Sequence, residues 1–134
     1  MDKGELYEAG MKVRREVLGD AYVDAAVDRQ TLFTEPFQDL LARFVWGSIW
    51  ARDGLSRRDR SLVTVAALVA MGRGDELRLH VRGALNNGVT QDELRELFLQ
   101  CAAYCGAPAA LSAFHIAADV FAAGDQGGTA AQGQ

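Results

Sequence analysis

Residues 55–87 read LSRRDRSLVTVAALVAMGRGDELRLHVRGALNN, and they contain the most apolar run of the chain, residues 62–71. Only Thr64 interrupts that run. Upstream, Ser56 followed three positions later by Asp59 is typical of a helix start, although a capping box proper has Glu or Gln at the later position. Because the run has no polar face, it predicts a helix that is buried on most sides.

A second helix is predicted to follow a glycine break at Gly72 and Gly74. It begins near Asp75, with acidic residues in its first turn, where they complement the positive end of the helix dipole. Glu76 and His80 lie four residues apart and share one face of this helix. The pair is either a carboxylate that orients an imidazole used as a general acid or base, or a surface pair without a role. The helix N-terminus lowers the pKa of His80 and the carboxylate raises it, and the sequence leaves open which prevails.

Length and composition indicate one soluble globular domain. The 134 residues suffice for one core, and 49% hydrophobic with 24% charged residues is ordinary for such a domain. A net charge of −4 argues against nucleic acid or an anionic membrane as the main partner, yet it permits a small anionic substrate where arginines cluster. No apolar run reaches the roughly 18 residues of a membrane span, and the N-terminus MDKGELYEAG has no apolar signal region, so we expect a cytoplasmic protein.

The remainder of the chain is also predicted to be helical, because no segment shows the alternation of a strand. Further helices are expected over residues 3–18, 36–52, 90–105 and 107–123, with residues 20–34 irregular apart from short helical turns and residues 124–134 a disordered tail. Residues 1–123 should therefore form a single all-α domain, an antiparallel bundle of about six helices.

Arginines gather around both ends of the apolar helix, at Arg52, Arg57, Arg58, Arg60 and Arg73. In a site they would pair with substrate carboxylates, and otherwise they are solvated residues of a loop and a first helical turn. Arg60, just before the apolar run, is the one expected to point inward with its stem buried.

Cys101, Cys105 and His115 could be considered as a metal site. Two cysteines four apart on one helix, with a single histidine, do not have the spacing of a structural zinc site, and a disulfide within one helix has poor geometry. We expect the thiols to be small core residues in a reducing compartment, His115 to be an ordinary helix histidine, and no metal to be bound.

A family resemblance covers most of the chain, from about residue 36 to residue 120. It is carried by RDRSLVTVAALVAMGRGDELRLHVRGALNNGVTQDELREL, by the upstream FVWGSIWARDGLSRRDRSL and by the downstream CAAYCGAPAALSAFHIA. These residues resemble the carboxymuconolactone decarboxylase family, which has an all-α, alkylhydroperoxidase-like fold. LHVRGALNNGVT before an acid-rich helix, and WGSIW before a Gly-Leu turn, are similar to its decarboxylase branch in particular.

The chain departs from the peroxidase branch of that fold. There, a Cys-x-x-Cys pair lies just before the histidine, and a glutamate lies about one helix and loop earlier. Placing that histidine on His80 puts the two thiols on Arg73 and Glu76 and the glutamate on Ser61. Without a thiol pair no disulfide exchange can run there, and the chain's two cysteines lie on another helix. The departure favours a lyase.

The resemblance implies conversion of 4-carboxymuconolactone to 3-oxoadipate enol-lactone and CO₂, in protocatechuate (β-ketoadipate) catabolism. No cofactor is expected, because the conjugated lactone carbonyl of the substrate can take up the electrons that CO₂ leaves behind. We expect His80 to be the oxyanion or proton donor and Glu76 to orient it. Arg60 or Arg73 would hold a substrate carboxylate.

Trp46 and Trp50, four apart on one helix face, would form the apolar wall of that site. The resemblance further implies a homo-oligomer, a trimer or a hexamer. Two other functions stay open at this point: a peroxidase-like oxidoreductase of the same fold, and an oligomeric relative that is non-catalytic or acts on another ring acid.

Overall fold

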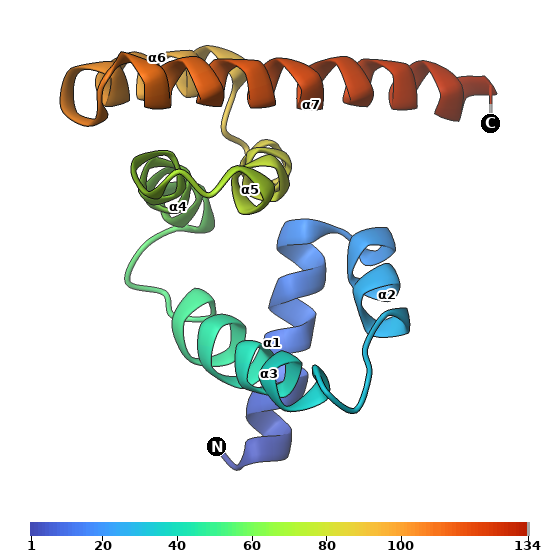
Figure 1. Cartoon of the computed structure of the whole chain (residues 1–134). Coiled ribbons are helices and arrows are strands. Elements are labelled where there is room, and N and C mark those ends of the chain that lie inside the picture. Colours follow the sequence, from blue (N-terminus) through green and yellow to red (C-terminus); the bar gives the residue numbers. More distant parts are fainter. Residues whose placement is uncertain (134) are drawn as a thin grey trace. The chain divides into compact units, whose positions relative to one another are not determined.

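The computed structural model describes the backbone of residues 1–133 and the side chains of residues 1–124. In that part of the chain every regular element is a helix, which confirms the predicted all-α class. The elements are α1 (Lys3–Leu18), α2 (Asp20–Asp28), α3 (Glu35–Leu40), the π-helical η1 (Leu41–Trp50), α4 (Arg57–Met71), α5 (Gly74–Asn86), α6 (Gln91–Cys105) and α7 (Ala107–Gly133) (Figure 1).

The helices differ from the expected set in three places, and one of them is the end of α7, which lies at Gly133 and not at residue 123. Helix α2 occupies a stretch that the sequence predicts to be irregular. Val23 is the one buried residue of this helix, so the helix lacks the repeated apolar residues that would have predicted it. The helix expected over residues 36–52 is divided into α3 and η1. Side chains beyond residue 124 lie outside the described part, and the disorder of residues 124–134 stays a prediction.

The chain divides into two compact units, Met1–Arg60 and Ser61–Gln134. That residues 1–123 form one domain stays a prediction.

In the first unit, glycines bring the backbones of α1 and η1 into direct contact. A Cβ atom on Gly10 would lie 1.8 Å from the carbonyl oxygen of Ala42, and one on Gly47 would lie 2.6 Å from that of Leu6. No side chain fits at either position without moving backbone atoms. The two elements therefore pack more closely than they could with side chains at these two positions.

The η1 segment winds more widely than an α-helix. The amide of Ala51 donates to the carbonyl of Trp46, five residues back, at 3.1 Å. The hydroxyl of Ser48 donates to the carbonyl of Arg43, also five residues back, at 3.0 Å. Such π-helical turns are rare and often occur near functional sites.

In the second unit, one buried core joins α4, α5, α6 and α7. Helices α6 and α7 form an antiparallel pair, while α4 and α5 cross them and are seen end-on in Figure 1. The buried side chains are Val65, Val69, Leu77, Val81, Ala84, Val89, Leu94, Phe98, Cys101, Ala113, Ala117 and Val120.

Local signals place the helix ends in this unit. Gly72, with a φ of 68°, ends α4 as the sequence predicts, because this left-handed conformation costs other residues free energy. The capping box of α6 is also confirmed: the amide of Glu93 donates to the Thr90 hydroxyl and the amide of Thr90 to the Glu93 carboxylate, both at 3.0 Å.

The prediction that the apolar helix, α4, is buried on most sides is wrong. Ser61, Val65 and Val69 form its buried face, but Val63 is 62% exposed and Met71 68% exposed. The absence of a polar face therefore did not mean full burial, since apolar side chains can remain on the surface of a folded chain.

Among the residues that the structure describes, one helical stretch, Ala107–Gly124 of α7, is long and apolar enough to cross a membrane by length and composition. This is weak support for a span, because core helices of soluble proteins pass the same test. Ala110, Ala113, Ala117 and Val120 of this helix are buried in the fold.

We predict that Gly10→Ala lowers the free energy of unfolding by about 2–3 kcal/mol, since the added methyl group forces α1 away from η1. Gly4→Ala on the same helix is the matched control, because its Cβ would come no closer than 3.4 Å to another atom. Denaturant unfolding monitored by circular dichroism measures both. Equal stability of the two variants would contradict the close approach.

Candidate functional site around His80

The apolar face of α5 fixes the direction in which His80 projects. Leu77, Val81 and Ala84 are buried in the core of the second unit. At 100° per residue, His80 lies at the edge of that buried face, and Glu76 lies one step farther out. The His80 side chain is accordingly half-buried, with its Nδ1 atom fully covered.

Glu76 is held from the other side by an arginine. Nη2 of Arg73 donates to Oε1 of Glu76 at 2.5 Å. The backbone amide of Glu76 itself, followed by the guanidinium of Arg73, lowers the pKa of this carboxyl below its usual value. The carboxylate is therefore ionised at neutral pH and lies within electrostatic reach of the imidazole.

Burial decides the protonation state of His80, which the sequence left open. Loss of solvent lowers the pKa of the imidazole below its ordinary value of 6.5, and the charge of Glu76 opposes this without overcoming it. At neutral pH the ring is neutral, so it presents one N–H donor and one acceptor nitrogen.

A second polar pair in the same unit was not expected from periodicity. Nδ2 of Asn87 donates to Oγ of Ser61 at 2.9 Å, and Ser61 is 1% exposed. The only sequence signal was the resemblance, which places the glutamate of the peroxidase branch at Ser61. In this chain, that position holds the uncharged Ser61, which is hydrogen-bonded to Asn87.

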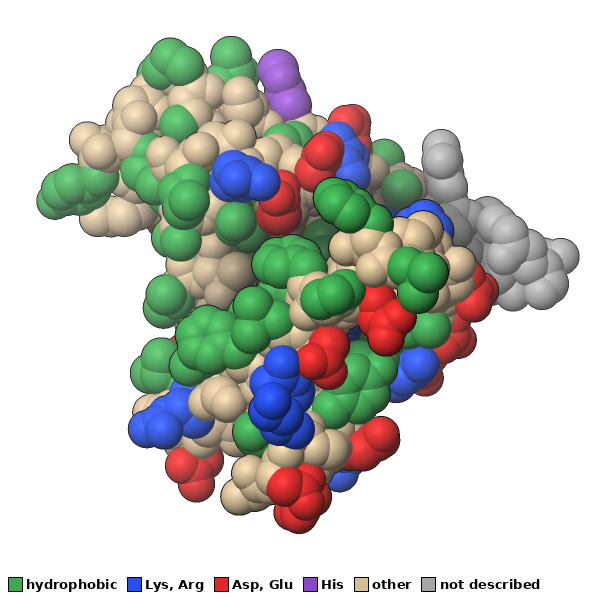
Figure 2. All heavy atoms as spheres, turned by 60° about the horizontal axis from the view of Figure 1, so that its bottom comes forward, with side chains coloured by type: hydrophobic (Ala, Val, Ile, Leu, Met, Phe, Trp, Pro, Cys, Tyr) green, Lys and Arg blue, Asp and Glu red, His purple; other side chains and the backbone are tan. Residues whose placement is uncertain are grey.

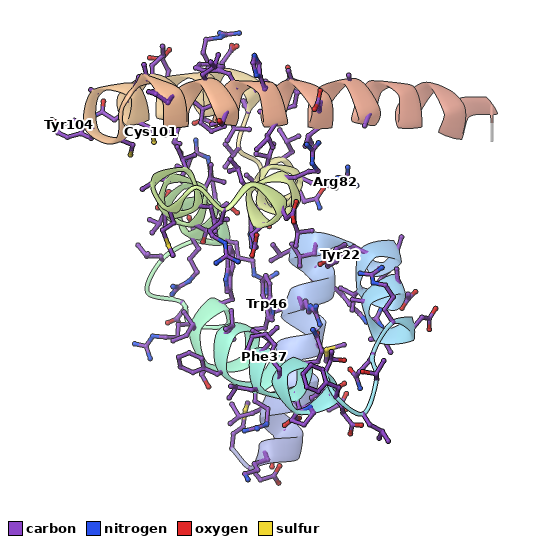
Figure 3. All side chains as sticks on the ribbon, in the orientation of Figure 1. Tyr22, Phe37, Trp46, Arg82, Cys101 and Tyr104 are labelled. Atoms are coloured by element: carbon purple, nitrogen blue, oxygen red, sulfur yellow. The ribbon has the colours of Figure 1, made fainter. Side chains whose placement is uncertain are left out.

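The other predicted site residues belong to the first unit. Trp46, which is labelled in Figure 3, and Trp50 are both buried, and their rings stack with centroids 5.1 Å apart. Nη2 of Arg60 donates to the carbonyl of Arg52 at 3.2 Å, and its Nε atom is buried, which confirms the inward stem. The structure thus brings together Arg73, Glu76 and His80 in one unit and the two tryptophans in the other; the substrate-binding roles stay predictions.

The remaining arginines and the cysteines have ordinary surroundings. Arg57 pairs with Glu16 at 3.1 Å, and the pair is partly exposed. Cys101 is buried in the core of the second unit, as expected, whereas Cys105 is exposed. Burial raises the pKa of the Cys101 thiol, which disfavours a reactive thiolate. The described residues contain no group of three or more potential metal ligands.

Comparison with known proteins fits this geometry. The family model described as "Carboxymuconolactone decarboxylase family" matches residues 35–119. The chain is 49% identical over 121 residues to a 4-carboxymuconolactone decarboxylase of Acinetobacter baylyi, an alignment that covers 90% of each chain. The chain belongs to the carboxymuconolactone decarboxylase family.

Two further relatives of this chain are also decarboxylases by name. A nitrosuccinic acid decarboxylase of Metarhizium robertsii is 46% identical over 108 residues, covering 81% of this chain and 76% of that protein. A 4-carboxymuconolactone decarboxylase of Pseudomonas putida is 45% identical over 47 residues, covering 35% of this chain and 98% of that sequence. The family resemblance drawn from the sequence is confirmed.

The surroundings of His80 predict a specific titration. The folded pKa lies below the unfolded value, so protonation favours unfolding. The stability that neutral His80 contributes is present above about pH 6.5 and is lost as the pH falls through the folded pKa. We expect Glu76→Gln to lower the pKa of His80 further, because it removes the charge that raises it.

Imidazole chemical shifts followed by NMR over pH 4–8 measure this pKa (the pH range is roughly that of histidine titration). The chain has two histidines, so His115→Gln identifies the resonance of His80. Asp75→Asn, on the same helix turn, is the matched control and should leave the pKa unchanged. An increase of the pKa in Glu76→Gln would contradict the assignment of Glu76 as the nearby charge.

Proposed function

We propose that this chain is a carboxy-lyase that converts 4-carboxymuconolactone to 3-oxoadipate enol-lactone and CO₂, in protocatechuate (β-ketoadipate) catabolism and in the cytoplasm. The observation that carries the proposal is the replacement at α5. His80 is kept, while the two positions of the peroxidase thiols hold the Arg73–Glu76 ion pair. The identity to a decarboxylase along 90% of both chains supports the same substrate.

The reaction needs a stabilised anion more than it needs a cofactor. The leaving carboxylate is attached to the γ-carbon, which a carbon–carbon double bond links to the lactone carbonyl. When CO₂ departs, the bonding electrons move into that carbonyl and form a dienolate, and protonation of the α-carbon then gives the enol-lactone. The enzyme therefore has to stabilise negative charge on the carbonyl oxygen in the transition state.

A neutral His80 suits this task. Its ring N–H can donate to the developing oxyanion, and because the ring is already partly desolvated, the hydrogen bond is stronger than it would be in water. Glu76 is a positioning residue that orients the ring and favours the partial positive charge that grows on it. Arg73, bound to Glu76 through Nη2, retains other N–H groups that can hold the second carboxylate of the substrate.

Nitrosuccinic acid is the alternative substrate, favoured by the 46% identity to the Metarhizium robertsii protein. In that acid a nitro group on the carbon that bears one carboxyl group takes the electrons, so the same oxyanion donor would serve. A peroxidase function has less support, because it needs a reactive thiol pair and α5 offers an ion pair in its place.

We also propose a homo-oligomer, a trimer or a hexamer. Several large apolar side chains of the first unit are exposed, and Figure 2 shows such side chains among charged ones on the displayed face. Phe37, Leu40 and Phe44, which are 59%, 46% and 56% exposed, follow one another at helical spacing. A contiguous apolar strip of this kind is typical of a surface that a partner covers.

We predict that His80→Ala loses at least about 100-fold in turnover of 4-carboxymuconolactone, the usual effect of removing a positioned proton or hydrogen-bond donor. CO₂ release and loss of 4-carboxymuconolactone, measured without added metal or nucleotide, give the rate. Parallel assays with nitrosuccinic acid rank the two substrates by kcat/KM. Unchanged helicity and melting temperature show that the variant is folded.

His115→Ala and the double variant Cys101→Ser/Cys105→Ser are the controls, and both should keep their activity. A loss smaller than about tenfold in folded His80→Ala would remove His80 from the mechanism. Loss of activity in the double cysteine variant would favour a peroxidase-like function that depends on the thiols.

Light scattering should give a mass three or six times the 14.5 kDa of one chain. We expect Phe37→Glu with Phe44→Glu to lower that mass, because two charges then lie on the apolar strip. A wild-type mass of one chain would overturn the proposed assembly.

A further inference from the structure

A cavity of about 290 Å³ lies within the first unit, and none of the predicted site residues lines it. It is bounded by α1, α2 and the segment that leads into α3, and Figure 3 shows Tyr22 where α1 and α2 lie side by side. Its polar lining consists of Arg14, Tyr22, Arg29, Gln30, Thr34 and Gln38. All of these except Gln38 precede residue 35 and so lie outside the segment that the family model matches.

Arg14 is the unusual member of this lining. It is 6% exposed, and its Nε atom is buried without a hydrogen-bond acceptor among the described residues. None of the carboxylates that the structure describes forms an ion pair with it. A buried cation without a counter-ion costs free energy, and proteins normally pair such a charge.

The neighbouring Arg15, in contrast, has the carboxylate partners that an arginine usually has. Nη1 of Arg15 donates to Asp20 at 3.1 Å and to Asp24 at 2.8 Å, and both carboxylates are exposed. The acids on α2 therefore serve Arg15 on the surface and leave Arg14, facing the cavity, without one. Burial lowers the pKa of Arg14, and the nearby Tyr22 and Tyr7 oppose this, but a guanidinium stays charged at neutral pH.

The rest of the cavity wall adds to the positive potential. Arg29, at the C-terminal end of α2, brings a second guanidinium, and the side chains of Tyr22, Gln30 and Gln38 can donate hydrogen bonds. None of the described acidic side chains lines this cavity. The larger cavity of the same unit, about 430 Å³, differs in this respect, since Glu8, Glu35 and Asp39 line it together with basic residues.

We propose that the Arg14 cavity is a binding site for a small organic carboxylate. The guanidinium of Arg14 would pair with the carboxylate group, Arg29 would add a second charge at the rim, and the amides of Gln30 and Gln38 would contact the remaining oxygens. The volume is that of roughly ten water molecules at about 30 Å³ each, which is enough for an acid of several carbon atoms. The inference does not depend on the reaction proposed for His80.

NMR of the arginine Nε–H groups in the full-length protein tests this site directly, with succinate and benzoate as probes. We expect a saturable shift of the Arg14 signal at constant ionic strength, and little or no shift with chloride. Arg14→Gln identifies the signal and should abolish binding of both probes, measured independently by calorimetry. Arg15→Gln, one residue along the same helix, is the matched control and should bind as the wild type does.

Because Arg14 is buried, its replacement could also disturb folding, so Arg29→Gln at the exposed rim is the second variant. It should weaken binding about tenfold, the loss expected for one charge-assisted hydrogen bond, and leave the melting temperature unchanged. No saturable shift with either acid at millimolar concentration would overturn the proposal. So would binding that persists in both Arg14→Gln and Arg29→Gln, an equal response to chloride, or a crystal structure in which a carboxylate of a second copy of the chain fills the cavity.

Discussion

The packing of one face of α5 constrains the chemistry of the second unit. Leu77, Val81 and Ala84 must face the core, and the helical period then leaves no freedom in where Glu76 and His80 point. His80 comes to lie at the boundary between core and surface. That position gives it a depressed pKa while Glu76 remains ionised beside it. A helix rotated by one residue would either expose the imidazole fully or bury it.

The same helix shows how a fold can exchange one kind of chemistry for another. The peroxidase branch, as the resemblance describes it, moves electrons through two thiols next to the histidine. In this chain those positions hold a guanidinium and a carboxylate in contact, and neither group has redox chemistry. In the proposed mechanism the imidazole therefore handles protons and hydrogen bonds. Membership of a family that includes proteins named as decarboxylases of two different acids fits a site built around charge stabilisation.

The first unit has two features that the helical periodicity of the sequence did not predict. The glycine contact between α1 and η1 depends on backbone atoms that meet across the sequence, at Gly10 and Ala42. Arg14 could have been noticed as a charge on the apolar stripe of α1, between Val13 and Val17. Only the folded chain shows that it is buried and that none of the described carboxylates forms an ion pair with it. Both arise from approach through space, which a single stretch of sequence does not encode.

The sequence by itself determined the all-α class, the glycine break at Gly72, the capping box at Thr90, the shared face of Glu76 and His80, and the family. These follow from local backbone chemistry, from the helical period and from residue identity, which neighbours along the chain fully specify. The tertiary structure alone decided that α4 has an exposed side, that residues 41–50 wind as a π-helix, that Arg73 holds Glu76, and that His80 loses its proton more readily than a free imidazole. The physical reason is that solvent exclusion and contacts between side chains depend on the whole packed unit, and their effects on charge cannot be read from spacing.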